Sequence, residues 1–187
     1  APADMPELER LMLHRMVEMD ALVRKCVTEY DFHTLWVELH NFCANDLSAF
    51  YFDIRKDALY CDHPGEMRRR ACRTVLDQLF NALVCWLGPI TSFTADEAYL
   101  TRKFGSIEEA SAGESVHLLT YPDIPAEWRN DDLAARWAKV RQVRRVILGA
   151  LEVERREKRM RGSLEAAPQV FVTAEQAEAL QGLDLAE

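Results

Sequence analysis

The sequence predicts an all-α protein built as an antiparallel bundle of four or five helices. Apolar residues recur at helical spacing through most of the 187 residues. Hydrophobic residues make up 49% of the chain, which is enough to bury a core without a metal or disulfides. Short links separate the periodic segments, and short links favour antiparallel neighbours.

The first predicted helix spans residues 6–30, where apolar side chains fall at i, i+3, i+4 and i+7 spacing. This stripe consists of Leu8, Leu11, Met12, Met16, Met19, Leu22, Val23, Cys26 and Tyr30. Asp31 offers a side-chain acceptor for the free amides of a new helix. We expect that second helix to run to about Phe52.

The third helix is predicted to start at Pro64, because a proline loses no hydrogen bond at the first helical position. Its periodic pattern ends at Gly88-Pro89. Thr94 and Glu97 have the spacing of a capping box, so a short fourth helix is expected over residues 95–104.

Residues 105–128 lack periodicity and are expected to form an extended connection. The longest helix should begin at Asp131 or Asp132 and run to about Arg159. Residues 169–173, Q-V-F-V-T, suit a strand, and a weak helix is expected over 174–180. We therefore predict a helical domain over 1–161 and a small α/β extension over 162–187 that the chain truncates.

Charge is distributed unevenly. The formal net charge is −8. Between residues 136 and 161 there are ten basic and three acidic residues, a local charge of +7, whereas the rest of the chain carries −15. An evenly acidic surface would argue against nucleic acid, but Lys and Arg gathered on one helix are typical of phosphate binding.

Five cysteines without a C-x-x-C pair favour a reducing cytoplasm over a disulfide framework. No four-ligand set suggests a metal site, so no metal is expected. The longest apolar runs are too short to span a membrane. Because residue 1 is not Met and no signal region follows it, we expect the chain to be a piece of a larger protein.

Three segments resemble isoleucyl-tRNA synthetases. Residues 41–60, N-F-C-A-N-D-L-S-A-F-Y-F-D-I-R-K-D-A-L-Y, resemble the family pattern F-C-x-x-D-L-S-x-F-Y-x-D-I-x-K-D-x-L-Y. Residues 86–98, W-L-G-P-I-T-S-F-T-A-D-E-A, resemble a pattern shared with the valine, leucine and methionine enzymes. Trp137, Arg144, the run L-E-x-x-R-x-x-K over 151–158 and G-S-L-E-A over 162–166 resemble the isoleucine enzyme alone, although Arg161 stands where glycine is usual.

This resemblance implies the tRNA anticodon-binding domain of a class I synthetase, and with it a partner, tRNA(Ile). The parent enzyme would use ATP and Mg to join isoleucine to tRNA(Ile), with its catalytic and editing domains upstream. The chain lacks the family's H-I-G-H and K-M-S-K-S signatures and any Gly-rich phosphate loop. We therefore expect no catalytic residue and no cofactor here, and a monomer. The alternatives are the valine-type sister domain and a helical protein-interaction module without RNA binding.

Candidate RNA contacts fall in three groups, all of them basic or aromatic. The longest helix contributes Arg141, Arg144, Arg145, Arg155 and Lys158. The third helix opens with Arg68, Arg69, Arg70 and Arg73, and the second ends with Arg55, Lys56 and the aromatic Tyr51.

Each group has a structural alternative. The longest helix could present a solvated face, although Arg144 lies on its apolar stripe and could pair with Asp46 or Glu152. The third-helix arginines oppose the helix dipole, and they could contact phosphate or pair with Glu66 and Asp77. Three consecutive aromatics cannot all face inward on an α-helix, so we expect Tyr51 to point outward and stack on an anticodon base.

Overall fold

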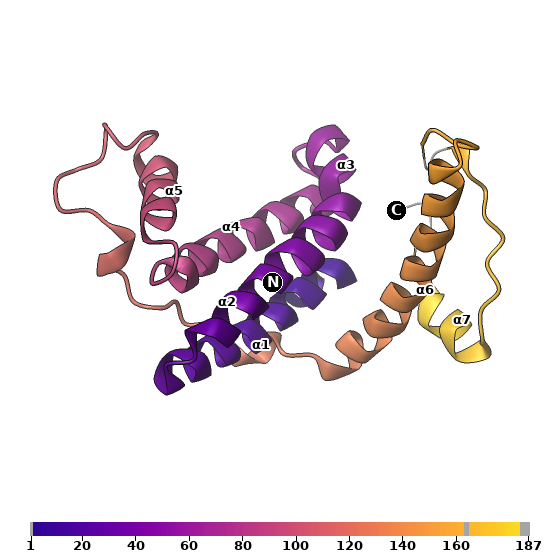
Figure 1. The fold of residues 1–187 in the computed structure, drawn as a ribbon, viewed down its shortest axis with the longest axis horizontal. Helices are drawn as coiled ribbons and strands as arrows, with labels where there is room; N and C mark the ends of the chain where they lie inside the picture. Colours follow the sequence, from indigo (N-terminus) through magenta and orange to yellow (C-terminus); the bar gives the residue numbers. More distant parts are fainter. Residues whose placement is uncertain (1, 163–164, 184–187) are drawn as a thin grey trace. The chain divides into compact units, whose positions relative to one another are not determined.

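A computed structural model describes residues 2–162 and 165–183 (Figure 1). Its elements are the 3₁₀ turns η1 (Pro2–Asp4), η3 (Val116–Leu118) and η4 (Ala126–Trp128), the π-helix η2 (Phe42–Phe52), and the α-helices α1 (Glu7–Glu29), α2 (Phe32–Asn41), α3 (Asp53–Cys61), α4 (Met67–Leu87), α5 (Ser92–Phe104), α6 (Asp131–Arg156) and α7 (Ala174–Leu180). No strand occurs in these two ranges, which confirms the all-α prediction.

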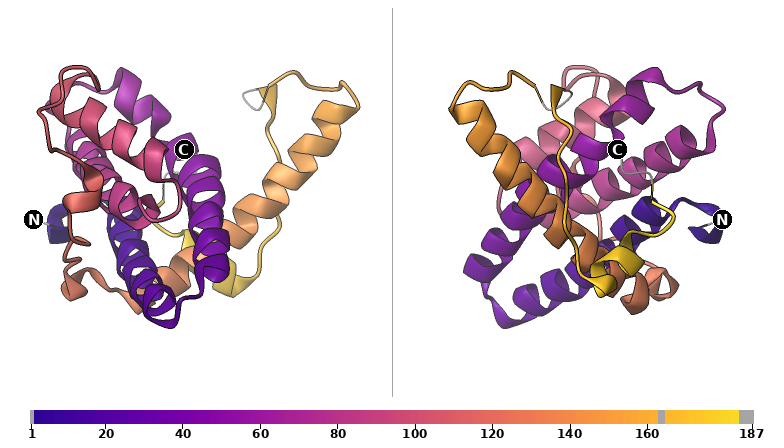
Figure 2. Two further views of the ribbon diagram at one scale, coloured as in Figure 1. Left: turned by 60° about the vertical axis from the view of Figure 1, so that its left-hand side comes forward. Right: turned by 90° about the vertical axis from the view of Figure 1, so that its right-hand side faces the viewer.

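The chain divides into two compact units, residues 1–129 and 130–187, here called the N-terminal and C-terminal units. In the N-terminal unit, α1 packs against α2 and α4, while α3 and α5 also contact α4 (Figure 2). The C-terminal unit is α6 packed against α7. The domain boundary expected at residue 161 stays a prediction; in these units α6 is grouped with α7, which it contacts.

The predicted stripe of α1 forms much of the core. Its apolar members from Leu8 to Cys26 are buried, with the exception of the half-buried Leu22. Tyr30 is different, since it ends the helix in a left-handed conformation at φ 57° and its side chain is 82% exposed. The stripe therefore stops at Cys26. As expected, Asp31 caps α2 by accepting a 3.0 Å hydrogen bond from the Thr34 amide.

The second predicted helix is continuous in position but changes its winding at Phe42. Residues 42–52 form a π-helix, in which each amide bonds five residues back. Tyr51 lies nine positions after Phe42, which in an α-helix is about two and a half turns and would place these two side chains on opposite faces. The wider π-helix makes about two turns over the same distance. Phe42, Leu47, Phe50 and Tyr51 can therefore all face the core, where each is at most 3% exposed.

Two helix starts differ from the sequence expectation. Pro64 lies in a turn closed by the Glu66 amide, which donates to the carbonyl of His63 at 2.9 Å, so α4 begins at Met67. In α5, the carbonyl of Thr91 already accepts from the Ala95 amide. Thr94 consequently lies inside the first turn, and the predicted capping box does not form.

The connection after α5 is held down by Asp96. Its carboxylate accepts 2.8 Å hydrogen bonds from the Ser115 hydroxyl and the Val116 amide. Val116 then joins a small core with Val84, Cys85 and Ala95. The sequence predicted the lack of periodicity over 105–128 but not this anchor, because the partners of Asp96 lie about twenty residues away.

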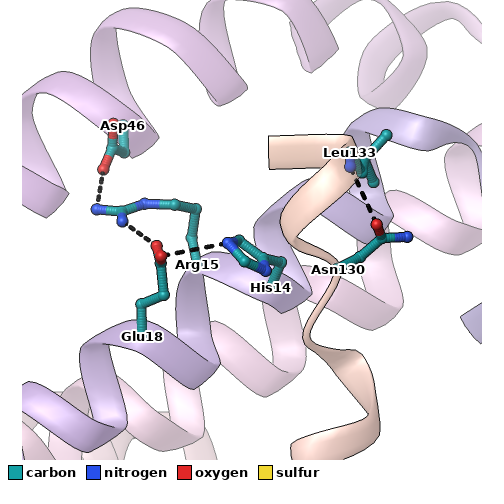
Figure 3. A network of polar contacts seen from close by, with 6 residues as sticks. All are labelled: His14, Arg15, Glu18, Asp46, Asn130 and Leu133. Atoms are coloured by element: carbon teal, nitrogen blue, oxygen red, sulfur yellow. Dashed lines mark hydrogen bonds and ion pairs between the residues drawn. The ribbon is translucent and has the colours of Figure 1, made fainter. Parts of the chain in front are cut away.

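In the C-terminal unit, α6 starts at Asp131 as expected, capped by the Asn130 side chain, which accepts from the Leu133 amide at 3.0 Å (Figure 3). It ends at Arg156, three residues before the predicted end, in a turn where Lys158 has φ 59°. The predicted weak helix is α7, and Thr173 and Gln176 form its capping box.

The predicted strand over 169–173 is wrong. These residues are irregular and exposed, and Phe171 is 93% exposed. A strand needs a partner for its backbone, and none lies among the described residues. The α/β character of the extension is therefore not seen. Ser163 and Leu164 of the G-S-L-E-A segment lie outside the described residues.

Candidate RNA interface

The α6 basic cluster consists of Arg141, Arg144, Arg145, Arg155 and Lys158. Arg145, Arg155 and Lys158 are exposed, whereas Arg141 and Arg144 are half-buried. Lys158 has its backbone amide bonded to the Arg155 carbonyl at 3.0 Å in the turn that ends the helix. Positive charge there is favourable because it opposes the negative end of the helix dipole.

Two cations of this segment, one of them a member of the cluster, form ion pairs with acidic residues close by in the sequence. Arg155 bonds Glu152 at 2.7 Å. Arg159 bonds Glu154, which raises the pKa of the guanidinium and lowers the pKa of that carboxyl. Exposed pairs of this kind contribute little to stability and exchange readily with solvent. The local charge of +7 is therefore still present, but part of it faces acidic neighbours on the same helix.

Two basic residues near the start of α6 have a structural role instead. Arg136 donates from Nε to the carbonyl of Ala179 at 2.9 Å and from Nη2 to the carbonyl of Gln181. Lys139 pairs with Glu175 at 2.6 Å, which lowers the pKa of that carboxyl. These contacts hold α7 against α6.

Each expected partner of Arg144 is engaged with another arginine. Asp46 accepts from Arg15 at 2.9 Å, and Glu152 accepts from Arg155. Arg15 also bonds Glu18, and Glu18 lies 3.3 Å from Nε2 of the buried His14 (Figure 3). This network joins α1 to the π-helix. Sequence reasoning missed it, because Arg15 and Asp46 are far apart in the chain.

The arginines at the start of α4 separate into two kinds. Arg68 forms a bidentate pair with Asp62, with two contacts of 2.8 Å, and the hydrogen bond lowers the pKa of the Asp62 carboxyl. Arg69 donates to the Asp62 carbonyl at 2.5 Å. Asp62 therefore takes the place of the expected partners, Glu66 and Asp77. Bidentate geometry makes Arg68 a loop anchor in this structure.

Arg70 and Arg73, by contrast, are exposed on the next face of α4. With Arg102 of α5 they line a groove of about 580 Å³, here called the α4/α5 groove. Asp77 also lines it and pairs with Arg102 at 3.1 Å. Sequence reasoning included Arg70 and Arg73 but not Arg102.

Two predicted RNA contacts are buried. Arg55 is 4% exposed and Tyr51 is 0% exposed, so neither can touch a bound molecule without unfolding of its surroundings. The expectation that Tyr51 points outward is wrong because the π-helix turns it inward. Lys56, the neighbour of Arg55, is exposed and pairs with Asp53 at 3.0 Å.

Arg55 and Tyr51 meet at Glu9, a fully buried carboxylate of α1. Arg55 donates from Nε to Oε1 at 2.7 Å and from Nη2 to Oε2 at 3.0 Å, and the Tyr51 hydroxyl donates to Oε1 at 3.2 Å. Burial lowers the pKa of Arg55, but the hydrogen bonds and charge of Glu9 outweigh it and leave that pKa raised. Burial, then the charge of Glu9, raises the pKa of Tyr51. We call these three residues the Glu9 cluster.

No described helix is long and apolar enough to cross a membrane. Within residues 2–162 and 165–183, no group of three or more His, Cys, Asp or Glu side chains has the arrangement of a metal site. The accessible basic residues leave three candidates for the interface, namely the α6 basic cluster, the α4/α5 groove and the exposed Lys56.

Comparison with known proteins agrees with this surface chemistry. Residues 9–170 match the family described as the anticodon-binding domain of tRNA ligase. The chain is 52% identical over its whole length to the isoleucine–tRNA ligase of Agrobacterium fabrum, and 50% identical to that of Brucella abortus. It is 47% identical over 98% of its length to that of Bartonella henselae.

The matched region is 18–19% of each of these relatives, so the chain spans about a fifth of their length. The family match covers most of the helical structure, from the first turn of α1 to the segment before α7. The chain belongs to the family of anticodon-binding domains of tRNA ligases.

Proposed function

We propose that this chain binds the anticodon stem and loop of tRNA(Ile) as part of an isoleucine–tRNA ligase. The observation that carries the proposal is 52% identity over the whole chain to an isoleucine–tRNA ligase, within a family of anticodon-binding domains. The relatives named above are all isoleucine enzymes, which favours this assignment over the valine enzyme. A protein-interaction module without RNA binding would leave the basic side of α6 unexplained.

The α6 basic cluster is the main RNA-facing surface in this proposal. Its exposed members, Arg145, Arg155 and Lys158, can reach phosphates without rearrangement of the helix. The pairing of Arg155 with Glu152 is an exposed contact that a phosphate can replace. Phosphate contacts of this kind fix the position of the RNA without reading its sequence.

The parent enzyme would charge tRNA(Ile) with isoleucine using ATP and Mg, with catalytic and editing domains upstream in the same cytoplasmic polypeptide. This chain supplies no nucleophile or nucleotide-binding loop to that reaction, so we expect it to be inactive alone and monomeric. Isoleucine-dependent pyrophosphate exchange measures the first point, and sedimentation measures the second. Pyrophosphate exchange above background would contradict the proposal that catalysis resides in the upstream domains.

The central test is a gel-shift comparison of tRNA(Ile) with other tRNAs at matched salt. Tighter binding to tRNA(Ile) supports the isoleucine assignment, and tighter binding to tRNA(Val) overturns it in favour of the sister enzyme. If four side chains of α6 each neutralise a phosphate, log K against log salt should have a slope of about −3 to −4. A flat salt dependence would remove the electrostatic basis of the proposal.

A further inference from the structure

The α4/α5 groove is a basic site within an acidic unit. Residues 1–129 contain 13 Lys and Arg but 21 Asp and Glu, a net charge of −8. In the groove the ratio is reversed, because three arginines face a single carboxylate, Asp77. Arg70 and Arg73 lie one turn apart on α4, with about 5–6 Å between Cβ atoms at this spacing. The arginines are therefore concentrated on a small area.

The cations of the groove differ from their neighbours in what they contact. Arg68 and Arg69 are engaged with Asp62, and Arg102 with Asp77. Within residues 2–162 and 165–183, the guanidinium groups of Arg70 and Arg73 have no hydrogen bond or ion pair. Arg70 lies in the first turn of α4, where positive charge opposes the helix dipole, so its charge does not stabilise that helix. An anionic ligand would supply the missing partner.

One lining residue of the groove is packed against the interior. Phe80 lines the groove and packs against the small core formed by Val84, Cys85, Ala95 and Val116. The pair between Arg102 and Asp77 joins α5 to α4 across it. Because Phe80 is already packed in place, a ligand that contacts its ring does not have to order that side chain.

We propose that the α4/α5 groove binds the phosphodiester backbone of the same RNA that the α6 basic cluster binds. This inference rests on the proposed function and adds a second contact surface in the N-terminal unit. Guanidinium groups can bind phosphate oxygens bidentately, and the apolar lining residues Phe80 and Leu76 suit the sugar face of a nucleotide. The contact is to the backbone, so it stabilises the complex equally for different base sequences.

The test compares Arg73→Gln with Lys25→Gln, which removes one equally exposed charge from α1, outside the groove. Each protein is titrated with a hairpin of the tRNA(Ile) anticodon stem and loop over a range of salt. Arg73→Gln should flatten the slope of log K against log salt by about 0.7–0.9, and Arg70→Gln with Arg73→Gln by about twice that. When the salt is raised from 50 to 200 mM, the affinity of Arg73→Gln should therefore fall by a factor about threefold smaller than the affinity of the parent chain. Lys25→Gln should keep the parent slope.

A second hairpin with altered anticodon bases tests whether the contact is to the backbone. The change in slope caused by Arg73→Gln should be the same for both hairpins. Arginine Nε–H resonances give an independent measurement, and those of Arg70, Arg73 and Arg102 should shift on addition of RNA.

Failure of this inference can be separated from failure of the proposed function. If the parent chain binds RNA but Arg73→Gln keeps the same slope as Lys25→Gln, and the groove resonances do not move, the groove is not an RNA site. The assignment of the chain then stands, and an acidic protein segment becomes the better candidate ligand. If the parent chain binds neither hairpin in low salt, the proposed function fails and this inference fails with it.

Discussion

The Glu9 cluster and the α6 basic cluster place arginines in opposite situations. In the Glu9 cluster one arginine is buried and donates two hydrogen bonds to a carboxylate that is itself fully buried. In the α6 basic cluster the cations are exposed or half-buried, and Arg155 pairs with Glu152 on the same helix. A basic residue in a family motif is therefore not by itself an RNA contact. Its depth decides whether its charge serves folding or binding.

Removal of Arg55 should have the largest effect. Arg55→Ala leaves the Glu9 carboxylate buried without its partner, which typically costs about 3–5 kcal/mol. Urea unfolding measures the loss as a lower midpoint. Replacing both residues with apolar ones of similar size, Glu9→Leu with Arg55→Met, should recover most of the stability. A loss below about 1 kcal/mol for Arg55→Ala would show that this pair is not buried in solution.

Tyr51→Phe should have a smaller effect on the same cluster. It removes one hydroxyl that donates to Glu9 but keeps the ring in the core, and a hydrogen bond to a charged group is worth about 1.5–3 kcal/mol. The 3.2 Å distance favours the lower end of that range. Affinity for the tRNA(Ile) hairpin should not change, because the side chain is inaccessible. A large loss of affinity in a variant of normal stability would restore the stacking role that the burial of Tyr51 contradicts.

The exposed arginines of α6 should show the reverse pattern. Changing Arg145 and Arg155, which are both exposed, together to Ala should flatten the salt slope of tRNA binding by about 1.4–1.8. The free energy of unfolding should stay nearly constant, because exposed charges contribute little to folding. Anisotropy titrations and urea melts of the same protein measure both. A parent-like slope would move the main RNA surface away from α6 and towards the α4/α5 groove.

Lys56→Ala gives the smallest expected change in stability and a matched control for Arg55→Ala. The two residues are consecutive, but Lys56 is exposed and pairs with the exposed Asp53 at 3.0 Å. Exposed pairs three residues apart on a helix contribute about 0.2–0.5 kcal/mol. The unfolding midpoint should therefore stay close to that of the parent. A loss comparable with Arg55→Ala would show that α3 as a whole, rather than burial of one charge, controls stability.

Much of the fold followed from local patterns. The apolar stripe of α1, the cap at Asp31, the stop at Gly88 and the start of α6 depend on residues within one or two turns of each other. Such signals depend on residues close together in the sequence, so they can be recognised without knowledge of the tertiary structure. The strand predicted over 169–173 failed for the converse reason, because a strand is stabilised by a partner and its own sequence does not show whether one exists.

Less of the candidate site than of the fold could be predicted from the sequence. The sequence identified the basic character of α6 and of the start of α4, since charge is a property of composition. It did not distinguish Arg68, engaged by Asp62, from Arg73, which lines a groove with Arg102 of another helix. That distinction needs the packing of α5 against α4.

The sequence by itself determined the helical class, most helix boundaries, the uneven distribution of charge and the family, because each depends on residue type and short-range spacing. Only the tertiary structure decided that residues 42–52 wind as a π-helix and turn Tyr51 inward. It also decided that Arg55 meets Glu9, 46 residues away in sequence. Burial and long-range pairing arise from the packing of whole helices, and the free energy of a charged side chain depends on that environment more than on its neighbours in the chain.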